Sequence, residues 1–429
     1  MKKYLSLIFV LCLLSIFGKA QENNKVSAKK SSIQLYGFIR SEYYYDTYKG
    51  LNAAQDNFYL FPLYKGLDAD GEHLNKQGIH GYTAMATRFG FNISGPEILG
   101  AKTSANFETD FAGIVAEYPE VLRLRKAYVK FDWEKSSLLV GQTWHPLWNG
   151  SGAFFPQVGG LNTGSPYNPF NRSPQIDFDY KLGAKTTLSL TALYEQQYTS
   201  PGFYKVDDTN DKNLAKRNAG IPELVAGLYY NNDGMSLGLA GQFNAIKPID
   251  VTEGTAGKYK SDELNTSYAV MSYIGYRKDK WFFLLKELVG QNLTNMLMIG
   301  GYGVKSYDAA TGAMTYTNYT TSSTLVNVVY GTKHQLGFFA GMTNNFGTKD
   351  ALHNFDGAAQ TKGLMPTMKQ VYRVAPYFAY NYKNLRFVAE YEIDSADYGT
   401  GTFDFSDGLY DDTVTATNHR ILLMLTYNF

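Results

Sequence analysis

The last twelve residues of the chain, 418–429, read NHRILLMLTYNF. Every second position from Ile421 to the terminal Phe429 is apolar, whereas the positions between Arg420 and Asn428 are mixed. Successive side chains of a β-strand point to opposite sides, so these two sets would lie on opposite faces. One apolar and one mixed face is the pattern of a strand in a membrane β-barrel.

The same period of two recurs along the chain. It is clear in TRFGFNIS (87–94), AKTSANFETDF (101–111) and NLRFVAEYEID (384–394). Sixteen strands are predicted in this way, at residues 33–47, 82–94, 101–111, 121–132, 136–144, 173–182, 186–197, 222–231, 235–244, 264–277, 281–291, 322–332, 334–344, 370–381, 384–394 and 418–429. The number is even, which brings both ends of the barrel domain to the same side.

The connections between these strands alternate in length. The short ones are 95–100, 133–135, 183–185, 232–234, 277–280, 333 and 382–383. The long ones are 48–81, 145–172, 198–221, 245–263, 292–321, 345–369 and 395–417, with a medium one at 112–120. Short periplasmic turns and long outer loops are typical of bacterial outer-membrane barrels. We therefore predict an all-β fold, a sixteen-stranded antiparallel transmembrane barrel spanning residues 33–429.

Composition agrees with this prediction. The chain has 35 tyrosines, 27 phenylalanines and 41 glycines, which favour pleated surfaces and turns. Its mean hydropathy is only −0.28, and after residue 20 no apolar run is long enough for a membrane-spanning helix. Aromatic residues flank the short connections and would suit a membrane interface, although β propensity alone also explains them: Trp133, Tyr230, Tyr276, Trp281, Tyr382 and Phe429.

The first twenty residues resemble an export signal. Lys2 and Lys3 precede an apolar stretch from Tyr4 to Phe17, and small residues end at Ala20. We expect cleavage after residue 20 and a short periplasmic segment at 21–32. Cleavage removes three of the 40 basic residues and no acidic one, leaving 37 against 39, and it removes Cys12, the one cysteine. Nucleic-acid binding and disulfide chemistry are therefore not expected.

A barrel of sixteen strands is wide enough for water, and charges on its inner face would govern which ions pass. We predict passive diffusion of small polar solutes through an outer-membrane porin, with a mild preference for anions. The predicted pore-lining residues are Arg40, Glu42, Arg88, Glu108, Asp110, Arg123, Arg125, Glu287, Arg373, Arg386, Glu390 and Arg420. The alternative is that these charges form internal salt bridges that only stiffen the wall; both can hold.

The third long connection, 145–172, interleaves prolines and glycines with aromatic residues. A loop with so many apolar rings is disfavoured in water. We therefore predict that it folds inward and narrows the pore, with Phe154, Phe155 and Tyr167 as packing anchors. A cap over the mouth and a contact with a neighbouring subunit are the alternatives.

No sequence pattern indicates catalysis, a metal site or a cofactor. The histidines are scattered, and neither a metalloprotease motif nor G-x-S-x-G is present. Acidic runs at 68–72 and 207–211 could bind calcium, but solvated loops are the favoured interpretation. The competing functions are a barrel enzyme, a plugged receptor or transporter, and an adhesive or structural barrel without a channel.

Strand 121–132 raises the question of partners. If Arg123 and Arg125 face inward, simple alternation places Lys126 and Lys130 toward lipid, which costs ~2–4 kcal/mol each at mid-membrane. Burial against another subunit would remove that cost, and so would a position near the membrane boundaries. The first explanation supports an oligomer, and a homotrimer is expected. The other expected partners are outer-membrane lipid and lipopolysaccharide of a Gram-negative bacterium, and small polar or anionic solutes.

Three segments carry a family resemblance. VLRLRKAYVKFDWEKSSLLVGQTWHPLW (121–148), LYGFIRSEYYYD (35–46) and ELVGQNLTNMLMIGGYGV (287–304) resemble the DcaP-like porins, in particular members from Bacteroidetes. The resemblance implies a trimeric sixteen-stranded diffusion porin for small anions or dicarboxylates, with Arg40, Arg123 and Arg125 in the lumen. Better-known members carry an N-terminal coiled coil, whereas only about residues 21–32 precede the first strand here.

Overall fold

The fold is described from a computed structural model, which covers residues 31–53, 58–115, 118–149, 154–160, 162–204 and 213–429. The predicted signal peptide (1–20) and nearly all of the segment 21–32 lie outside the described residues. No helix within the described ranges is long and apolar enough to cross a membrane.

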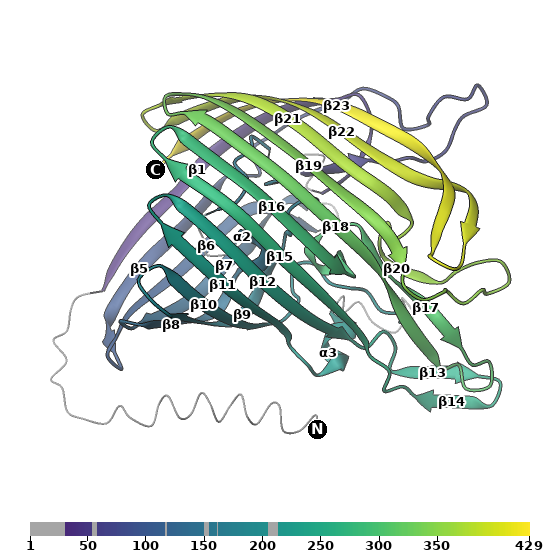
Figure 1. Cartoon of the computed structure of the whole chain (residues 1–429). Coiled ribbons are helices and arrows are strands. Elements are labelled where there is room, and N and C mark those ends of the chain that lie inside the picture. Colours follow the sequence, from purple (N-terminus) through teal and green to yellow (C-terminus); the bar gives the residue numbers. More distant parts are fainter. Residues whose placement is uncertain (1–30, 54–57, 116–117, 150–153, 161, 205–212) are drawn as a thin grey trace.

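Sixteen of the described strands form a closed ring. In ring order they are β1 (Ser32–Asp46), β5 (Arg88–Ile98), β6 (Ala101–Val115), β7 (Tyr118–Asp132), β8 (Ser136–Trp144), β9 (Arg172–Lys181), β10 (Thr186–Leu193), β11 (Glu223–Asn232), β12 (Met235–Ile246), β15 (Asn265–Lys278), β16 (Trp281–Gln291), β18 (Met314–Gly331), β19 (His334–Thr348), β21 (Met368–Tyr382), β22 (Leu385–Asp404) and β23 (Leu409–Asn428). Each strand pairs antiparallel with the next, and β23 pairs with β1, which closes the ring. Figure 1 shows the strands steeply tilted around the barrel. The predicted sixteen-stranded antiparallel barrel is confirmed.

Closure depends on the two ends of the barrel domain. Phe38 of β1 pairs with Asn428 of β23, and Gly37 and Phe429 exchange two backbone hydrogen bonds of 3.1 Å. A closed ring leaves no unpaired strand edge, which is the condition for a sheet to reside in lipid.

The two faces of the wall differ as predicted. On β1, Ile33, Leu35 and Ile39 are exposed on the outer face, whereas Glu42 and Asp46 are buried on the inner face. In the C-terminal strand the predicted apolar set is exposed and the alternate set from Arg420 to Thr426 is buried. Exposed outward rings gather near the short turns: Tyr180, Tyr276, Trp281, Tyr330, Tyr382, Tyr427 and Phe429.

The remaining elements belong to the long connections between the barrel strands. They are β2 (Gly50–Ala53), β3 (Phe58–Pro62), β4 (Ile79–Thr83), α2 (Pro146–Asn149), α3 (Leu214–Ala219), β13 (Val251–Gly254), β14 (Gly257–Lys260), η2 (Leu293–Met296), β17 (Gly300–Tyr307) and β20 (Thr361–Leu364). The β13–β14 hairpin projects beyond the barrel (Figure 1).

Several predicted boundaries are wrong. The predicted connection 112–120 lies mostly in β6 and β7, β10 ends at Leu193 rather than at 197, and β18 begins at Met314 rather than at 322. The predicted loop 395–417 consists mostly of strand, because β22 and β23 continue past the apolar band and meet at a turn near 405–408. The predicted strand 82–94 is interrupted: β4 pairs with the outer half of β1, and β5 begins only at Arg88, after a turn in which Met85 and Ala86 are buried.

The hydrophobic core lies inside the barrel. Wall residues such as Met271, Leu284 and Phe339 cluster there with Phe61 from β3 and Tyr167 from the loop 145–172. The interior therefore holds loop segments as well as wall side chains, and these segments define the candidate site.

Candidate functional site

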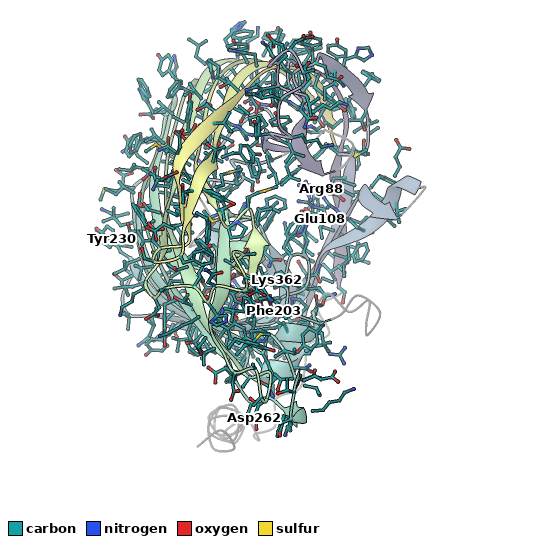
Figure 2. All side chains as sticks on the ribbon, turned by 90° about the vertical axis from the view of Figure 1, so that its right-hand side faces the viewer. Arg88, Glu108, Phe203, Tyr230, Asp262 and Lys362 are labelled. Carbon is teal, nitrogen blue, oxygen red and sulfur yellow. The ribbon has the colours of Figure 1, made fainter. Side chains whose placement is uncertain are left out.

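One side of the interior carries a dense group of charges on three adjacent strands. We call it the basic wall: Arg88 on β5, Glu108 and Asp110 on β6, and Arg123, Arg125 and Lys126 on β7. Adjacent antiparallel strands place these side chains opposite one another, because Asp110 pairs with both Arg88 and Arg123 in the sheet register. Figure 2 shows Arg88 and Glu108 on the inner side of the wall and Tyr230 on the outer surface.

The two carboxylates of the basic wall are each shared by several cations. Arg123 Nε lies 2.6 Å from Asp110 Oδ1, and Arg125 Nη1 lies 2.6 Å from Asp110 Oδ2. Arg125 Nε lies 2.7 Å from Glu108 Oε1, which is also 3.9 Å from Arg88 Nε. Charge-assisted contacts of this geometry hold the guanidinium groups in fixed orientations. The predicted residues Arg88, Glu108, Asp110, Arg123 and Arg125 are thus brought together.

Exposure within the basic wall is uneven. The side chains of Arg88, Arg123 and Lys126 are 21%, 26% and 25% exposed, whereas those of Glu108 and Asp110 are 4% and 0% exposed. The acids lie beneath the cations and neutralise them only in part. The surface presented to the barrel interior is therefore basic.

Lys126 was predicted to face lipid, and this is wrong. A β-bulge at Arg125 places two steps of β7 against one step of β6, so that Leu124 pairs with Thr109 and Lys126 with Glu108. The bulge reverses the alternation. Lys126 thus points inward with Nζ 3.4 Å from Glu108 Oε2, and Lys130 follows on the same face.

The bulge is stabilised from the neighbouring strand. The side-chain amide of Gln142 on β8 donates to the backbone oxygens of Leu124 and Arg125 at 3.2 and 3.4 Å. The backbone carbonyls of the bulge, which are displaced from the regular strand pairing, thus keep a hydrogen-bond donor. Lys126 and Lys130 therefore carry no cost of burial in lipid, and they give no reason for a subunit contact at this strand.

Glu287 was predicted to line the pore, and the structure places it on the outer face. It alternates with the inward, buried Lys286 and shares its face with exposed Trp281 and Val289. Ser322 Oγ donates to its carboxylate at 2.6 Å, and Thr324 donates to the other oxygen. Adjacent Lys and Glu in WFFLLKELVGQ make either face plausible from sequence, and here the lysine occupies the inner one.

The predicted inward loop 145–172 packs inside the barrel in the parts that are described. The ring of Phe154 stacks on Phe282 at 5.9 Å, Phe155 stacks on Trp148 at 4.7 Å, and Tyr167 lies 6.1 Å from Phe339. Two glycines of the wall make room, since a Cβ at Gly275 would lie 2.3 Å from the Phe154 ring and one at Gly341 would lie 2.5 Å from Tyr167.

Charged wall residues hold the backbone of this loop. Glu390 on β22 accepts the N–H groups of Gly159 and Gly160 at 2.7 Å each. Lys286 on β16, fully buried, donates to Trp148 O at 2.9 Å, to Asn168 Oδ1 at 2.7 Å and also to Leu147 O. Arg40, paired with Glu42, donates to Gly159 O at 2.6 Å. Sequence reasoning missed Lys286, because its role depends on a partner more than a hundred residues away.

A second group of charges, which includes the predicted Arg373 and Arg420, lies on β21–β23 and the end of β1, next to the basic wall around the ring. It is closed off from the interior space. Arg373 pairs with Asp394 and lies 3.2 Å from Glu392, and Arg420 Nη1 lies 2.9 Å from Asp46. All five are at most 2% exposed. Of the remaining predictions, Arg386 sits near the short-turn end and donates to Gln335 and Asn381.

Buried polar groups at the loop end belong to hydrogen-bond networks. His145 Nδ1 accepts the N–H of Leu147, so Nε2 carries the proton and donates to Glu223 at 2.6 Å. Glu195, just beyond the end of β10, accepts from Ser200 N at 2.9 Å and Asn244 Nδ2 at 2.7 Å. Burial, and after it the charge of Glu223, raises the pKa of Glu195 to about 7.

Among the described residues, no three His, Cys, Asp or Glu side chains gather as metal ligands. The acidic run 207–211 lies outside the described residues.

A closed antiparallel barrel with an apolar outer face, charges on its inner face and a long loop packed inside has the architecture of the outer-membrane porins. Among solved structures it is similar to the outer-membrane channel DcaP of Acinetobacter baumannii, with a TM-score of 0.66 and 19% identity over 96% of this chain and 100% of that one.

Two further solved structures are similar. The anion-selective porin from Comamonas acidovorans matches with a TM-score of 0.52 and 10% identity over 93% of this chain and 100% of that one. The trimer form of OmpT from Vibrio cholerae matches with a TM-score of 0.52 and 9% identity over 94% of this chain and 100% of that one. No protein-family model and no curated protein sequence matches this chain. At these identities the likeness is one of fold, and at that level the resemblance to DcaP-like porins is confirmed.

Proposed function

We propose that this chain is an outer-membrane porin of a Gram-negative bacterium, through which small polar solutes diffuse passively. The observation that carries the proposal is the closed sixteen-stranded ring with exposed apolar residues outside and charged residues inside. A ring of this size encloses more space than its own wall side chains fill. The export signal predicted at 1–20 and the similarity to outer-membrane channels support the location. Outer-membrane lipid and lipopolysaccharide would contact its outer face.

We also propose a mild preference for anions such as carboxylates. The cations of the basic wall are partly exposed and its acids are buried, so a permeating anion meets guanidinium and ammonium groups first. Fixed charge in a narrow pore favours the opposite ion. One of the similar structures is an anion-selective porin, which agrees with this proposal.

The proposed assembly is a homotrimer. It is supported by the similarity to OmpT of Vibrio cholerae, an outer-membrane protein solved in a trimer form. The mass of the purified protein in a mild detergent, corrected for bound detergent, tests it; a monomer mass would contradict it.

Liposome swelling tests the channel directly. Liposomes carrying the purified protein are expected to swell in isotonic arabinose or glycine much faster than empty liposomes. An enzyme or an adhesive barrel, the alternatives left open by the sequence, would not accelerate swelling. Swelling no faster than in empty liposomes would contradict the porin proposal.

A further inference from the structure

The first long loop also enters the barrel. Its strands β2 and β3 form a hairpin, and all five residues of β3, from Phe58 to Pro62, are buried. Neighbouring side chains of a strand point to opposite sides, so both faces of β3 are covered. A hairpin at the rim of the barrel would leave one face in water.

The wall on one side of β3 is identified by hydrogen bonds. Arg373 on β21 donates from Nη2 to Tyr59 O at 3.1 Å and to Leu60 O at 3.2 Å. Tyr398 on β22 donates to Pro62 O at 2.7 Å, and the guanidinium of Arg420 on β23 lies 5.6 Å from the Tyr59 ring. The hairpin therefore lies along the inner face of β21, β22 and β23.

The other side of β3 packs on the loop 145–172. Phe58 meets Phe170 edge-on with ring centres 4.9 Å apart, and Asn162 donates to Tyr59 O at 3.4 Å. Arg373 joins the two segments directly, because its Nη1 donates to Ser165 O at 3.1 Å while Nη2 holds the hairpin. One buried guanidinium thus fixes both loops to each other and to the wall.

The start of the first loop is fixed as well. Asn418 Oδ1 accepts the N–H groups of Thr47 and Tyr48 at 2.9 and 3.0 Å, and Asn418 Nδ2 donates to Asp46 at 2.8 Å. The chain leaves β1 already directed inward.

We infer that the β2–β3 hairpin is a second constriction element. It fills the part of the lumen lined by β21–β23 and narrows, from the neighbouring side of the ring, the passage that runs along the basic wall. The inference rests on the proposed porin function and extends it. The size limit is then set by two loops together, and solutes pass close to Arg88, Arg123 and Lys126. The buried charges Arg373, Glu392 and Asp394 are positioning residues for the two loops.

Replacement of residues 51–61 by Gly-Gly tests the inference. Single-channel conductance in planar bilayers is expected to rise roughly twofold or more, because pore cross-section limits the current. The anion preference is expected to fall, because a wider path lies farther from the basic wall. The matched control replaces residues 252–259 of the exposed β13–β14 hairpin by Gly-Gly, and its conductance is expected to equal that of the wild type.

The outcomes separate the two proposals. If the wild type conducts and the 51–61 replacement leaves the conductance unchanged, the inference of a second constriction is overturned. The proposed porin function then still holds. A folded wild-type protein without any conductance overturns the porin function itself. Folding of each variant is checked by its heat-dependent migration on gels.

A thiol experiment needs no deletion. The mature chain expected after cleavage holds no cysteine, so a single introduced thiol is labelled selectively. Leu51 on β2 is partly exposed, and reaction of Leu51→Cys with a bulky water-soluble methanethiosulfonate is expected to lower the conductance, since the label enlarges the hairpin inside the lumen. Ala256→Cys, at the exposed turn between β13 and β14, is expected to react without effect. Equal conductance before and after labelling of Leu51→Cys, with labelling verified by mass, overturns the inference.

Discussion

Lys126 and Glu287 carry opposite charges and face opposite sides of the same wall. Lys126 adds to the basic surface inside the barrel, whereas Glu287 is held on the outer face by two hydroxyl groups. A charge affects permeating ions strongly only when it faces the water through which they move. Substitutions of these two residues therefore test which face of the wall lines the pore.

Lys126→Gln is expected to reduce the ratio of anion to cation permeability by roughly a factor of two, because it removes one of three partly exposed cations while both acids remain. The reversal potential under a salt gradient measures this ratio. Glu287→Gln, the control, is expected to leave the reversal potential unchanged. A shift in the control equal to that of Lys126→Gln would contradict the assignment of faces.

Glu195 predicts a dependence of stability on pH. Its folded pKa of about 7 lies above an unfolded value of about 4.3, so the folded state binds its proton more tightly. The contribution of Glu195 to the free energy of unfolding is fully present below about pH 4 and is lost as the pH rises through about 7. The total loss is on the order of 3 kcal/mol. The charges that face Glu195 are Glu223 and Lys216.

The measurement is the midpoint of thermal unfolding in detergent at about pH 5 and about pH 8. The wild type is expected to be less stable at the higher pH, and Glu195→Gln is expected to lose much of that difference. An identical pH dependence in both proteins would show that another group is responsible.

At the scale of elements, sequence periodicity predicts the strands well because lipid imposes a strict rule on the outer face. The rule weakens outside the apolar band, so the continuation of β22 and β23 past Asp394 is not visible in the pattern. It also fails at the bulge of β7, because one extra residue reverses every later side chain. The inward course of the first loop was not predicted, since its contacts with Arg373 join residues more than three hundred positions apart.

The loop 145–172 was predicted from its composition, and its removal has a defined expected effect. Deletion of residues 150–168 is expected to raise single-channel conductance, because the loop leaves the lumen and Glu390 and Ser323, which now hold its backbone, become solvated. Thermal unfolding and gel migration verify that the barrel remains closed. Unchanged conductance in a folded variant would contradict the constriction.

At the scale of the whole molecule, closure and selectivity are separate properties. Closure follows from backbone pairing around sixteen strands and from an apolar outer face, and both follow from the alternation along the chain. Selectivity depends on which inner charges remain accessible after two loops have packed inside. Of the predicted inner charges, Arg373, Glu390 and Arg420 on β21–β23 are buried, whereas Arg88 on β5 and Arg123 on β7 stay partly exposed.

The most direct measurement is the current through the purified wild-type protein in a planar bilayer under a potassium chloride gradient. We predict stepwise insertions with a stable open conductance. We also predict a reversal potential shifted from zero toward the equilibrium potential of chloride. A well-folded protein that inserts without conducting would show that the interior is closed to ions. It would contradict the account of a water-filled barrel with a basic wall.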